Sequence, residues 1–325
     1  MMDEMRTTAS LREERARKQL QKTLLECLAP PPDARGKVRD LYFRRDEILL
    51  VATDRVSAFD VVLGTVPLKG EMLTEQASFW LKKASGVIPT HLLERVDAQV
   101  MRCARVQPLP VEMVVRGYLA GSLMREPRET RGAAYGLQLD PNLGDYERLD
   151  TPIVTPTTKA EVGQHDQPCS LQDLVASGAV SQKHLSQMVE AALALFDMGA
   201  KFASEQGLLL VDTKYEFGLQ DDRLVLIDEV HTADSSRFWK AEGYTERIAA
   251  GQTPEMLDKE RLRRWLSARG FMGSGTPPAL SEEIRLELTC HYWELTEMVL
   301  GQVFSPTGGD TQARVESCLR QVLDR

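Results

Sequence analysis

The segment 208–239, which reads LLLVDTKYEFGLQDDRLVLIDEVHTADSSRFW, limits the possible folds of this chain more than any other segment. Apolar and aromatic residues occupy both of its ends, and Gly218 and the polar run 219–223 interrupt them. Two such halves around a Gly/Asp-rich break predict a β-hairpin. If Gly218 pairs with Leu224, a five-residue loop closes the turn and fixes the register by counting. The pairs that follow are Glu216 with Leu226, Lys214 with Asp228, and Asp212 with Val230.

This register gathers charged side chains on one face of the hairpin, because successive side chains of a strand alternate between faces. Glu216 and Asp228 become diagonal neighbours, roughly 7–8 Å apart at Cα. Carboxylates on half-buried strands repel one another unless a cation lies among them, and Mg²⁺ takes one or two protein carboxylates together with phosphate oxygens. The alternative is a solvated outer face with a Lys214–Asp228 ion pair. The charged face holds Asp212, Lys214, Glu216 and Asp228, and the opposite face holds Thr213, Tyr215, Phe217, Val225 and Ile227.

Four polar residues follow the hairpin directly, namely Asp234, Ser235, Ser236 and Arg237. Two hydroxyls, a carboxylate and a guanidinium in consecutive positions suit a phosphorylated ligand, because they combine hydrogen-bond donors with a fixed positive charge. Their position just after the charged face favours a phosphate and metal site over a solvated surface.

The composition excludes several classes of protein. A chain of 325 residues with 42% hydrophobic and 27% charged residues is typical of a globular enzyme and is long enough for two lobes. A net charge of −8 argues against a nucleic-acid binder that neutralises many phosphates. No apolar run approaches the ~20 residues that span a bilayer, and the N-terminus does not resemble a secretory signal. The five cysteines fit neither a disulfide framework nor a zinc site, so we expect a cytoplasmic protein with reduced thiols and no nucleic-acid or membrane partner.

A basic turn, GKVRD at 36–40, opens the first predicted strand. Gly36 allows the backbone to approach a phosphate closely, and Lys37 and Arg39 supply positive charge. The spacing is not that of a Walker-type loop. An ordinary basic turn explains the same residues, and the residues alone leave both interpretations open.

A second polar segment, ATDRVSAFDV at 52–61, places Asp54, Arg55, Ser57 and Asp60 within seven residues. A loop of this kind can recognise a ligand that carries both an amine and a carboxylate. The alternative is a capped turn in which Asp54 and Ser57 accept hydrogen bonds from local backbone amides. Here too the residues alone do not decide.

Periodicity and capping residues predict the remaining elements. A charged helix over 10–28, with Ser10 as its N-cap, ends before three prolines and is interpreted as a packing appendage. Ser170 and Asp173 form a capping box at the start of a short helix. The segment 149–170, with three prolines, indicates a surface loop or a binding lid. Strands are predicted at 96–106 and 110–116, and helices at 181–207, 281–304 and 310–325.

Several of these motifs resemble, in the same order, those of the SAICAR synthetase family, the phosphoribosylaminoimidazole-succinocarboxamide synthases of purine biosynthesis. The similarity extends over about 36–266. Departures from the family pattern occur at Ala120, His231 and Ala233. The matching segments are GKVRDLY at 36–42, ATDRVSAFDV at 52–61, RGYLAGS at 116–122, TPTTKAEVGQHD at 155–166, and the hairpin with the residues that follow it.

The resemblance implies an α+β, two-lobed SAICAR-synthetase fold similar to that of ATP-grasp enzymes. ATP would bind in the cleft between a smaller β-rich N-terminal lobe and a larger α+β lobe. We expect an N-terminal helical extension at 1–32, the ATP-binding lobe at 33–112, and the larger substrate and ATP lobe with the C-terminal helices at 113–325. The oligomeric state, monomer or homodimer, stays open.

The resemblance also implies an ATP-dependent ligase. Its substrates would be L-aspartate, carboxyaminoimidazole ribonucleotide (CAIR) and ATP with Mg²⁺, and its products SAICAR, ADP and phosphate, formed through an acyl phosphate. One alternative is a small-molecule kinase with the same MgATP site, and a second is a non-catalytic regulator that binds nucleotides.

The family pattern assigns roles to individual residues. Arg116, which the pattern assigns to the imidazole nucleotide, could instead form a salt bridge between lobes. The ATP and cofactor residues are Gly36, Lys37, Arg39, Glu112, Met113, Val114, Lys214, Glu216 and Asp228, of which Glu216 and Asp228 bind the metal and Glu112, Met113 and Val114 line the adenine pocket. The catalytic residues are Lys214, Asp234 and Arg237. The substrate residues are Asp54, Arg55, Ser57, Asp60, Arg116, Ser122, Thr157, Thr158, Lys159, His165, Asp234, Ser235, Ser236 and Arg237, with Glu161 and Asp166 in the same segment as His165.

Overall fold

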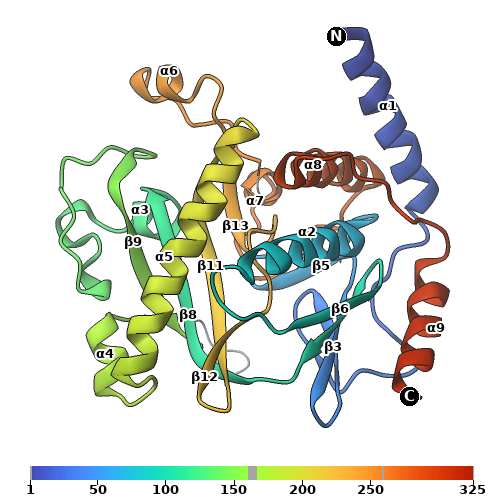
Figure 1. The fold of residues 1–325 in the computed structure, drawn as a ribbon. Helices are drawn as coiled ribbons and strands as arrows, with labels where there is room; N and C mark the ends of the chain where they lie inside the picture. Colours follow the sequence, from blue (N-terminus) through green and yellow to red (C-terminus); the bar gives the residue numbers. More distant parts are fainter. Residues whose placement is uncertain (1, 160–166, 258–259, 325) are drawn as a thin grey trace. The chain divides into compact units, whose positions relative to one another are not determined.

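The structure is a computed structural model that describes residues 2–159, 167–257 and 260–324 (Figure 1). These residues form a mixed α+β fold with two compact units. The first unit comprises Met1–Phe79, Leu92–Arg105 and Lys259–Arg325, and the second comprises Trp80–His91 and Val106–Asp258. In the described part of the chain, no helix is both long and apolar enough to cross a membrane. The domain boundaries after residues 32 and 112 stay a prediction.

The first unit is built on an antiparallel sheet of order β1-β2-β3-β7-β6, beside a separate hairpin of β4 and β5. The N-terminal helix α1 packs against α8, where Ala16 and Leu20 contact Leu286. The strands are β1 (Ala34–Arg35), β2 (Arg39–Phe43), β3 (Glu47–Ala52), β4 (Arg55–Ala58), β5 (Val61–Thr65), β6 (Leu92–Asp97) and β7 (Val100–Ala104). The helices are α1 (Met2–Gln19), α7 (Glu260–Ser267), α8 (Glu282–Leu300) and α9 (Thr311–Leu323), and α2 (Lys69–Ala84) begins in this unit and ends in the second.

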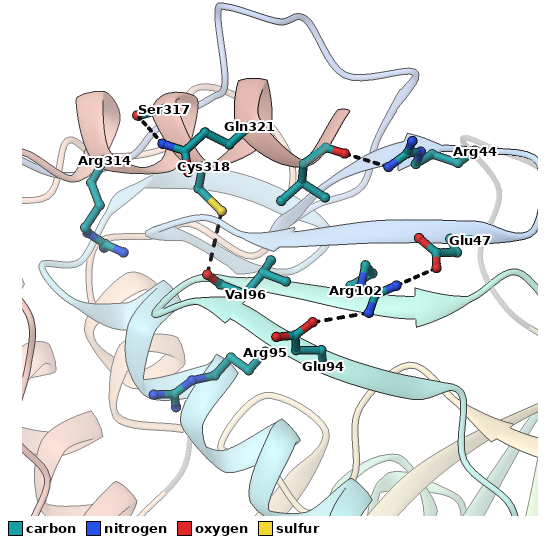
Figure 2. A pocket seen from close by; sticks show the side chains of 11 residues that line it. Arg44, Glu47, Glu94, Arg95, Val96, Arg102, Arg314, Ser317, Cys318 and Gln321 are labelled. Atoms are coloured by element: carbon teal, nitrogen blue, oxygen red, sulfur yellow. Dashed lines mark hydrogen bonds and ion pairs between the residues drawn. The ribbon is translucent and has the colours of Figure 1, made fainter. Parts of the chain in front are cut away.

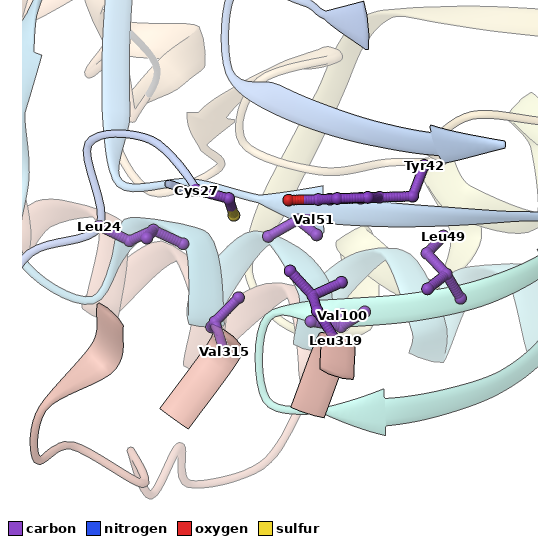
Figure 3. Packing of buried hydrophobic residues seen from close by; sticks show 8 residues of the cluster. All are labelled: Leu24, Cys27, Tyr42, Leu49, Val51, Val100, Val315 and Leu319. Atoms are coloured by element: carbon purple, nitrogen blue, oxygen red, sulfur yellow. The ribbon is translucent and has the colours of Figure 1, made fainter. Parts of the chain in front are cut away.

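The main hydrophobic cluster of the first unit joins parts of the chain that are far apart in sequence (Figure 3). Leu24 and Cys27 precede the sheet, whereas Val315 and Leu319 belong to α9. All four are fully buried, so the two ends of the chain complete one core together. The sheet contributes Tyr42, Leu49, Val51 and Val100 to the same cluster.

The second unit contains a sheet of order β10-β9-β8-β11-β12, with β13 also paired to β11. Helix α5 lies along β11 and β8 of this sheet (Figure 1), and its buried residues repeat at the predicted helical spacing. The capping box predicted at Ser170 is confirmed at the start of α4, and Ser181 caps α5. The strands are β8 (Gln107–Tyr118), β9 (Arg148–Thr158), β10 (Gln167–Pro168), β11 (Leu208–Gln220), β12 (Arg223–Ile227) and β13 (Ser236–Lys240). The helices are α3 (Gly121–Arg125), η1 (Arg128–Thr130), η2 (Ala133–Tyr135), α4 (Leu171–Ala176), α5 (Gln182–Glu205) and α6 (Tyr244–Ala249).

The predicted hairpin exists as β11 and β12, but its register differs by one residue from the predicted one. Gly218 pairs with Val225 rather than with Leu224, and the loop consists of Asp221 and Asp222 alone. These two residues have φ of 50° and 60°, the left-handed conformation that a two-residue type I′ turn needs. The five-residue loop was therefore a wrong prediction, because no glycine marks the turn.

The change of register exchanges the two faces of β12. Glu216 lies opposite Ile227 and Phe217 lies opposite Leu226, so Ile227 and Val225 share the face of Glu216 rather than the predicted apolar face. The predicted pairing of Lys214 with Asp228 is wrong as a strand register, because β12 ends at Ile227.

The helix predicted over 10–28 is also different, because α1 begins at Met2 and ends at Gln19. Ser10 therefore lies inside the helix, and its prediction as the N-cap is wrong. Beyond it, the backbone amides of Leu24 and Cys27 donate to side-chain carboxylates, at 2.7 and 2.9 Å, and not to carbonyls of a helix. Long-range partners thus replace the helical hydrogen bonds in this stretch.

Two further predicted elements are corrected. The segment 96–106 contains the end of β6 and all of β7, which pair with each other, and not one strand. The segment 149–170 begins within β9, so Thr157 and Thr158 lie on a strand and not in a loop. The strand predicted at 110–116 is confirmed as part of β8.

Candidate functional site

The basic turn of the first unit joins β1 to β2, and the amide of Gly36 donates to the carbonyl of Arg39 at 2.8 Å. The side chain of Lys37 forms an ion pair with Asp60, and the two side chains are 59% and 52% exposed. Such an exposed pair is weak, so an incoming anion can displace Asp60 from Lys37. The turn residues Lys37 and Asp60, from two separate predicted motifs, therefore meet at one surface.

Asp54 and Arg55 are buried, in contrast to the exposed pair. Asp54 accepts hydrogen bonds from the amides of Leu24 and Gly70, at 2.7 and 2.9 Å, and burial raises the pKa of its carboxyl to about 6. Within the described residues, the Arg55 side chain donates to three backbone carbonyls and, at 2.8 Å, to the carboxylate of Asp40. Ser57 lies on β4 and is also buried. The substrate role of all three stays a prediction.

In the second unit, charged side chains converge across β8, β9 and β11. Lys214 donates to Glu112 at 2.9 Å and forms an ion pair with Glu216, and Glu216 also pairs with Lys159. Asp228 lies 3.8 Å from the ammonium of Lys214. We call these five residues the Lys214 cluster.

Asp228 reaches this cluster although the hairpin register does not place it there. It follows the last residue of β12 and has a φ of 66°, a conformation that interrupts the alternation of side chains. The predicted closeness of Asp228 to Lys214 is therefore confirmed through a different geometry.

The carboxylates of the Lys214 cluster stabilise the protonated form of Lys214. Burial by itself would lower the pKa of the Lys214 ammonium, but the carboxylates of Glu216, Asp228 and Glu112 outweigh it and raise that pKa well above its ordinary value. Lys214 is thus a permanent cation and cannot act as a base near neutral pH.

The same cluster is the candidate metal site. Within the described residues, no three His, Cys, Asp or Glu side chains are arranged to hold a metal ion alone. Mg²⁺ needs only one or two protein carboxylates when phosphate oxygens and water complete its shell. Glu216 and Asp228, whose carboxylates both face one ammonium, fit that requirement.

A second group of side chains centres on Asp212, which is 4% exposed. Its Oδ2 atom accepts from Nη1 of Arg237 at 2.6 Å and from Nη1 of Arg116 at 3.3 Å. Arg116 also donates to Ser122 at 3.2 Å and to Thr155 at 2.8 Å. One carboxylate therefore holds two guanidinium groups near a hydroxyl, and we call these residues the Asp212 group.

The first residue of α3, Gly121, lies directly against this group. Gly121 has a φ of 62°, and a Cβ atom there would lie 2.6 Å from Nη1 of Arg237. Only glycine fits such an approach together with the left-handed conformation.

The turn that leads into β13 holds its hydroxyls by internal hydrogen bonds. The Oγ atom of Ser235 accepts from the amide of Thr232 at 3.1 Å, and Ser236 donates to Thr213 at 2.7 Å. Both serines are buried, whereas Asp234 and Arg237 are half-buried. In the segment 234–237, which is predicted to bind a phosphorylated ligand, the charged side chains are thus more exposed to solvent than the hydroxyls.

A family model described as SAICAR synthetase matches residues 33–276. The chain belongs to the SAICAR synthetase family. The phosphoribosylaminoimidazole-succinocarboxamide synthase of Cytophaga hutchinsonii is 42% identical over 285 residues, which cover 86% of this chain and 92% of that protein. The synthase of Bacteroides fragilis strain ATCC 25285 is 40% identical over 273 residues, 83% of this chain and 87% of its own.

Solved structures of the family also match. A SAICAR synthase from Saccharomyces cerevisiae, in complex with SAICAR, is similar with a TM-score of 0.75 and 30% identity, covering 88% of this chain and 99% of that one. The mixed α+β fold is therefore that of the SAICAR synthases. The family interpretation of the sequence is confirmed.

His231, at which this chain departs from the family pattern, is completely buried. Its Nε2 atom shares a hydrogen bond with the hydroxyl of Tyr215, and its ring packs edge-on against Trp80 at 4.7 Å. Gly199 of α5 leaves the space that the imidazole fills. Burial lowers the pKa of His231 to about 3, so the ring is neutral and serves packing.

A cavity of about 630 Å³ in the first unit contains none of the predicted site residues (Figure 2). Its arginines have protein partners: Arg102 donates to Glu47 at 2.6 Å, and Arg44 donates to the carbonyl of Val322 at 2.6 Å. With its positive charge already paired, this cavity is not the candidate site. It is lined by Arg44, Glu47, Glu94, Arg95, Val96, Arg102, Arg314, Ser317, Cys318, Gln321 and Val322.

Several predicted residues stand apart from these groups. His165, Glu161 and Asp166 lie outside the described residues. Met113 is fully buried and Val114 is half-buried on β8, which pairs with β9 on one side and β11 on the other. The adenine role of these residues stays a prediction. Sequence reasoning missed Gly121 and Thr155, and it placed Asp212 on the charged face without a role; the RGYLAGS segment was the signal for Gly121.

Proposed function

We propose that this chain joins L-aspartate to CAIR in an ATP-dependent reaction that yields SAICAR, ADP and phosphate. The proposal rests on the family and on the relatives named above, and the yeast structure carries SAICAR itself. The observation that carries it furthest is the Lys214 cluster, where carboxylates and ammonium groups meet as a phosphoryl-transfer site requires.

We place ATP in a cleft between two lobes, in an ATP-grasp-like arrangement. The N-terminal lobe would comprise 33–112 and the larger lobe 113–325, with 1–32 as an extension. The enzyme would work in the cytoplasm with small-molecule partners only.

Lys37 is assigned to the ATP phosphates, with Gly36 and Arg39 beside it. Its exposed pair with Asp60 supports this role, because the cost of breaking that pair is small. Backbone groups of Glu112, Met113 and Val114 would read the adenine edge, and the Glu112 side chain points instead to Lys214.

Glu216 and Asp228 would hold Mg²⁺, directly or through water. When bound, the ion would neutralise phosphate charge and orient the transferring group. Lys214 stays protonated and neutralises charge beside them, and Lys159 can turn from Glu216 to a substrate anion.

The Asp212 group would hold the anionic groups of CAIR. Asp212 fixes Arg116 and Arg237 in one orientation, so the guanidinium groups are organised before the ligand arrives. Ser122, Ser235, Ser236 and Asp234 would complete the contacts, with Thr157 and Thr158 at the edge of β9.

The chemistry needs no covalent nucleophile. A free carboxylate resists an amine because oxide is a poor leaving group, so phosphorylation of CAIR must precede the attack by aspartate. The side chains position the reactants and balance charge.

The decisive experiment measures ADP release with MgATP and CAIR, with and without L-aspartate. Turnover that requires all three substrates, with SAICAR identified by mass, is the expected result. ADP release without aspartate would indicate a kinase or an uncoupled ATPase. A folded protein that binds ATP without turnover would indicate a regulator.

A further inference from the structure

The first three carbonyl oxygens of the basic turn, those of residues 36–38, all accept hydrogen bonds from the segment 53–55. The Nη2 atom of Arg55 donates to Gly36 at 3.1 Å and its Nε atom donates to Lys37 at 3.0 Å. The amide and the hydroxyl of Thr53 donate to Val38 at 2.9 and 2.8 Å. The two motifs GKVRD and ATDR thus form one hydrogen-bonded network.

These contacts orient the turn. The C=O and N–H groups of a trans peptide point in opposite directions. With the carbonyls of Gly36 and Lys37 directed at Arg55, the amides of Lys37 and Val38 point away from it. A phosphate is attracted to amides and repelled by carbonyls, so this orientation is the productive one for an anion.

The guanidinium of Arg55 is itself fixed on its other side. Its Nη2 atom also donates to Asp40, which is fully buried, and its Nη1 atom donates to the carbonyl of Leu25 at 2.7 Å. Asp40 in turn accepts from the amide of Cys27 at 2.9 Å. Arg55 is 6% exposed, and each of its three side-chain nitrogen atoms donates to at least one protein acceptor.

The stretch 24–27 is thereby part of the same hydrogen-bonded network. Leu24 donates to Asp54, and the side chains of Leu24 and Cys27 lie in the core that α9 completes (Figure 3). Both 24–27 and α9 lie outside the residues 33–276 that match the family model. Segments beyond the family region therefore support the turn that carries Lys37.

We propose that Arg55 is a positioning residue for the nucleotide, and that it acts with the stretch 24–27 to orient the turn 36–38 rather than contacting CAIR or aspartate. This inference rests on the proposed role of Lys37 and Gly36 in ATP binding. It replaces the substrate role that the sequence pattern assigns to Arg55 with an indirect one.

The test substitutes Arg55→Lys, which keeps a positive charge for buried Asp40 but loses the planar fork that reaches several carbonyls. ATP binding is measured by calorimetry, and KM for CAIR and aspartate by turnover. We expect the Kd for ATP to rise roughly tenfold, while KM for CAIR and for aspartate changes less than about twofold.

Arg285→Lys is the matched control. Arg285 of α8 also donates to backbone carbonyls, of Leu20 and Thr65 at 2.8 Å, but it does not contact the turn. Arg285→Lys should bind ATP with the affinity of the wild type, even if it lowers the thermal stability as much as Arg55→Lys does. Equal losses of ATP affinity in both variants would overturn the proposal, as would a raised KM for CAIR or aspartate with unchanged ATP binding in Arg55→Lys.

Thr53→Val gives a second reading if Arg55→Lys does not fold. Valine matches the shape of threonine and removes only the hydroxyl that donates to Val38. A rise of about two- to fivefold in the Kd for ATP supports the proposal, and unchanged ATP binding contradicts it. Since binding is measured without turnover, a wild-type chain that binds ATP but makes no SAICAR would reject the proposed ligase and leave this inference standing.

Discussion

The guanidinium of Arg237 lies against the backbone of Gly121, so close that a methyl group at position 121 would come within 2.6 Å of Nη1. Gly121→Ala must therefore displace Arg237, and it also forces alanine into a left-handed φ of 62°. We expect KM for CAIR to rise roughly tenfold or more while KM for ATP is little changed. Steady-state kinetics with each substrate varied in turn measures this.

Gly178→Ala is the control for the backbone cost. Gly178 has a φ of 74°, and in the described part of the chain no heavy atom beyond its two chain neighbours lies within 4 Å of the position of a Cβ. Both variants should lose about 1 kcal/mol of unfolding free energy from the left-handed conformation. A normal KM for CAIR in Gly121→Ala would contradict the placement of Arg237 at the substrate.

Asp212→Asn should weaken the substrate site and the fold together. The buried carboxylate accepts from Arg116 and Arg237, and its loss leaves two guanidinium groups without their shared counter-charge. We expect a loss of about 3 kcal/mol in the free energy of unfolding, because one partner of a buried pair is removed. KM for CAIR should rise and KM for ATP should not.

Asp222→Asn removes a carboxylate of the opposite kind. Asp222 pairs with Lys183 at 2.7 Å on the surface, with side chains 70% and 61% exposed. Urea unfolding should therefore detect little change in this variant. If Asp222→Asn and Asp212→Asn lost similar free energy of unfolding, Asp212 would not be the shared counter-charge that stabilises the two arginines.

Glu216→Gln should abolish turnover and leave the fold intact. The substitution keeps the shape of the side chain but removes a charge that faces Lys214 and Lys159. ADP release is the measurement, with circular dichroism and thermal melting as the check on folding. Glu47→Gln, which affects the ion pair with Arg102 in the first unit, should retain turnover; near-normal activity of Glu216→Gln would reject the metal assignment.

His231 should make the fold sensitive to acid. Burial lowers its pKa to about 3 from an ordinary value of 6.5, so below pH 6.5 the unfolded chain binds a proton that the folded chain excludes. The free energy of unfolding is therefore reduced as the pH falls, by about 2 kcal/mol between pH 7.5 and pH 5 from this group.

His231→Gln isolates that contribution, because every other group titrates in both proteins. Its stability relative to wild type, measured by urea unfolding, should improve by about 2 kcal/mol from pH 7.5 to pH 5. A difference that stays constant with pH would show that His231 does not lose its proton affinity on folding.

The sequence predicted the hairpin, the charged face and the caps at Ser170 and Ser181 because these depend on local pattern. Ser170 and Asp173 sit three residues apart, and that spacing alone specifies the capping box. The register of the hairpin was not accessible in this way. Asp221 and Asp222 adopt left-handed φ without a glycine, so the turn residues gave no signal of a two-residue loop.

The role of Arg55 depends on partners that are remote in sequence, and the pattern could not reveal it. Leu25 lies thirty residues before Arg55, and their contact forms only when the stretch 24–27 leaves the helix. The same contacts explain why a helix predicted over 10–28 ends at Gln19. Periodicity records which residues favour a helix, but not which carboxylates compete for its amides.

The core in Figure 3 has a consequence for how the chain is made. Leu24 and Cys27 are translated just before the strands that they cover, whereas Val315 and Leu319 are translated after all the strands that the structure describes. Since α9 closes this core, the first unit keeps exposed apolar surface until α9 has been translated. The second unit, which ends at Asp258, can complete its sheet earlier. Newly made chains that stop before residue 311 should therefore need a chaperone to protect the unit that carries Lys37.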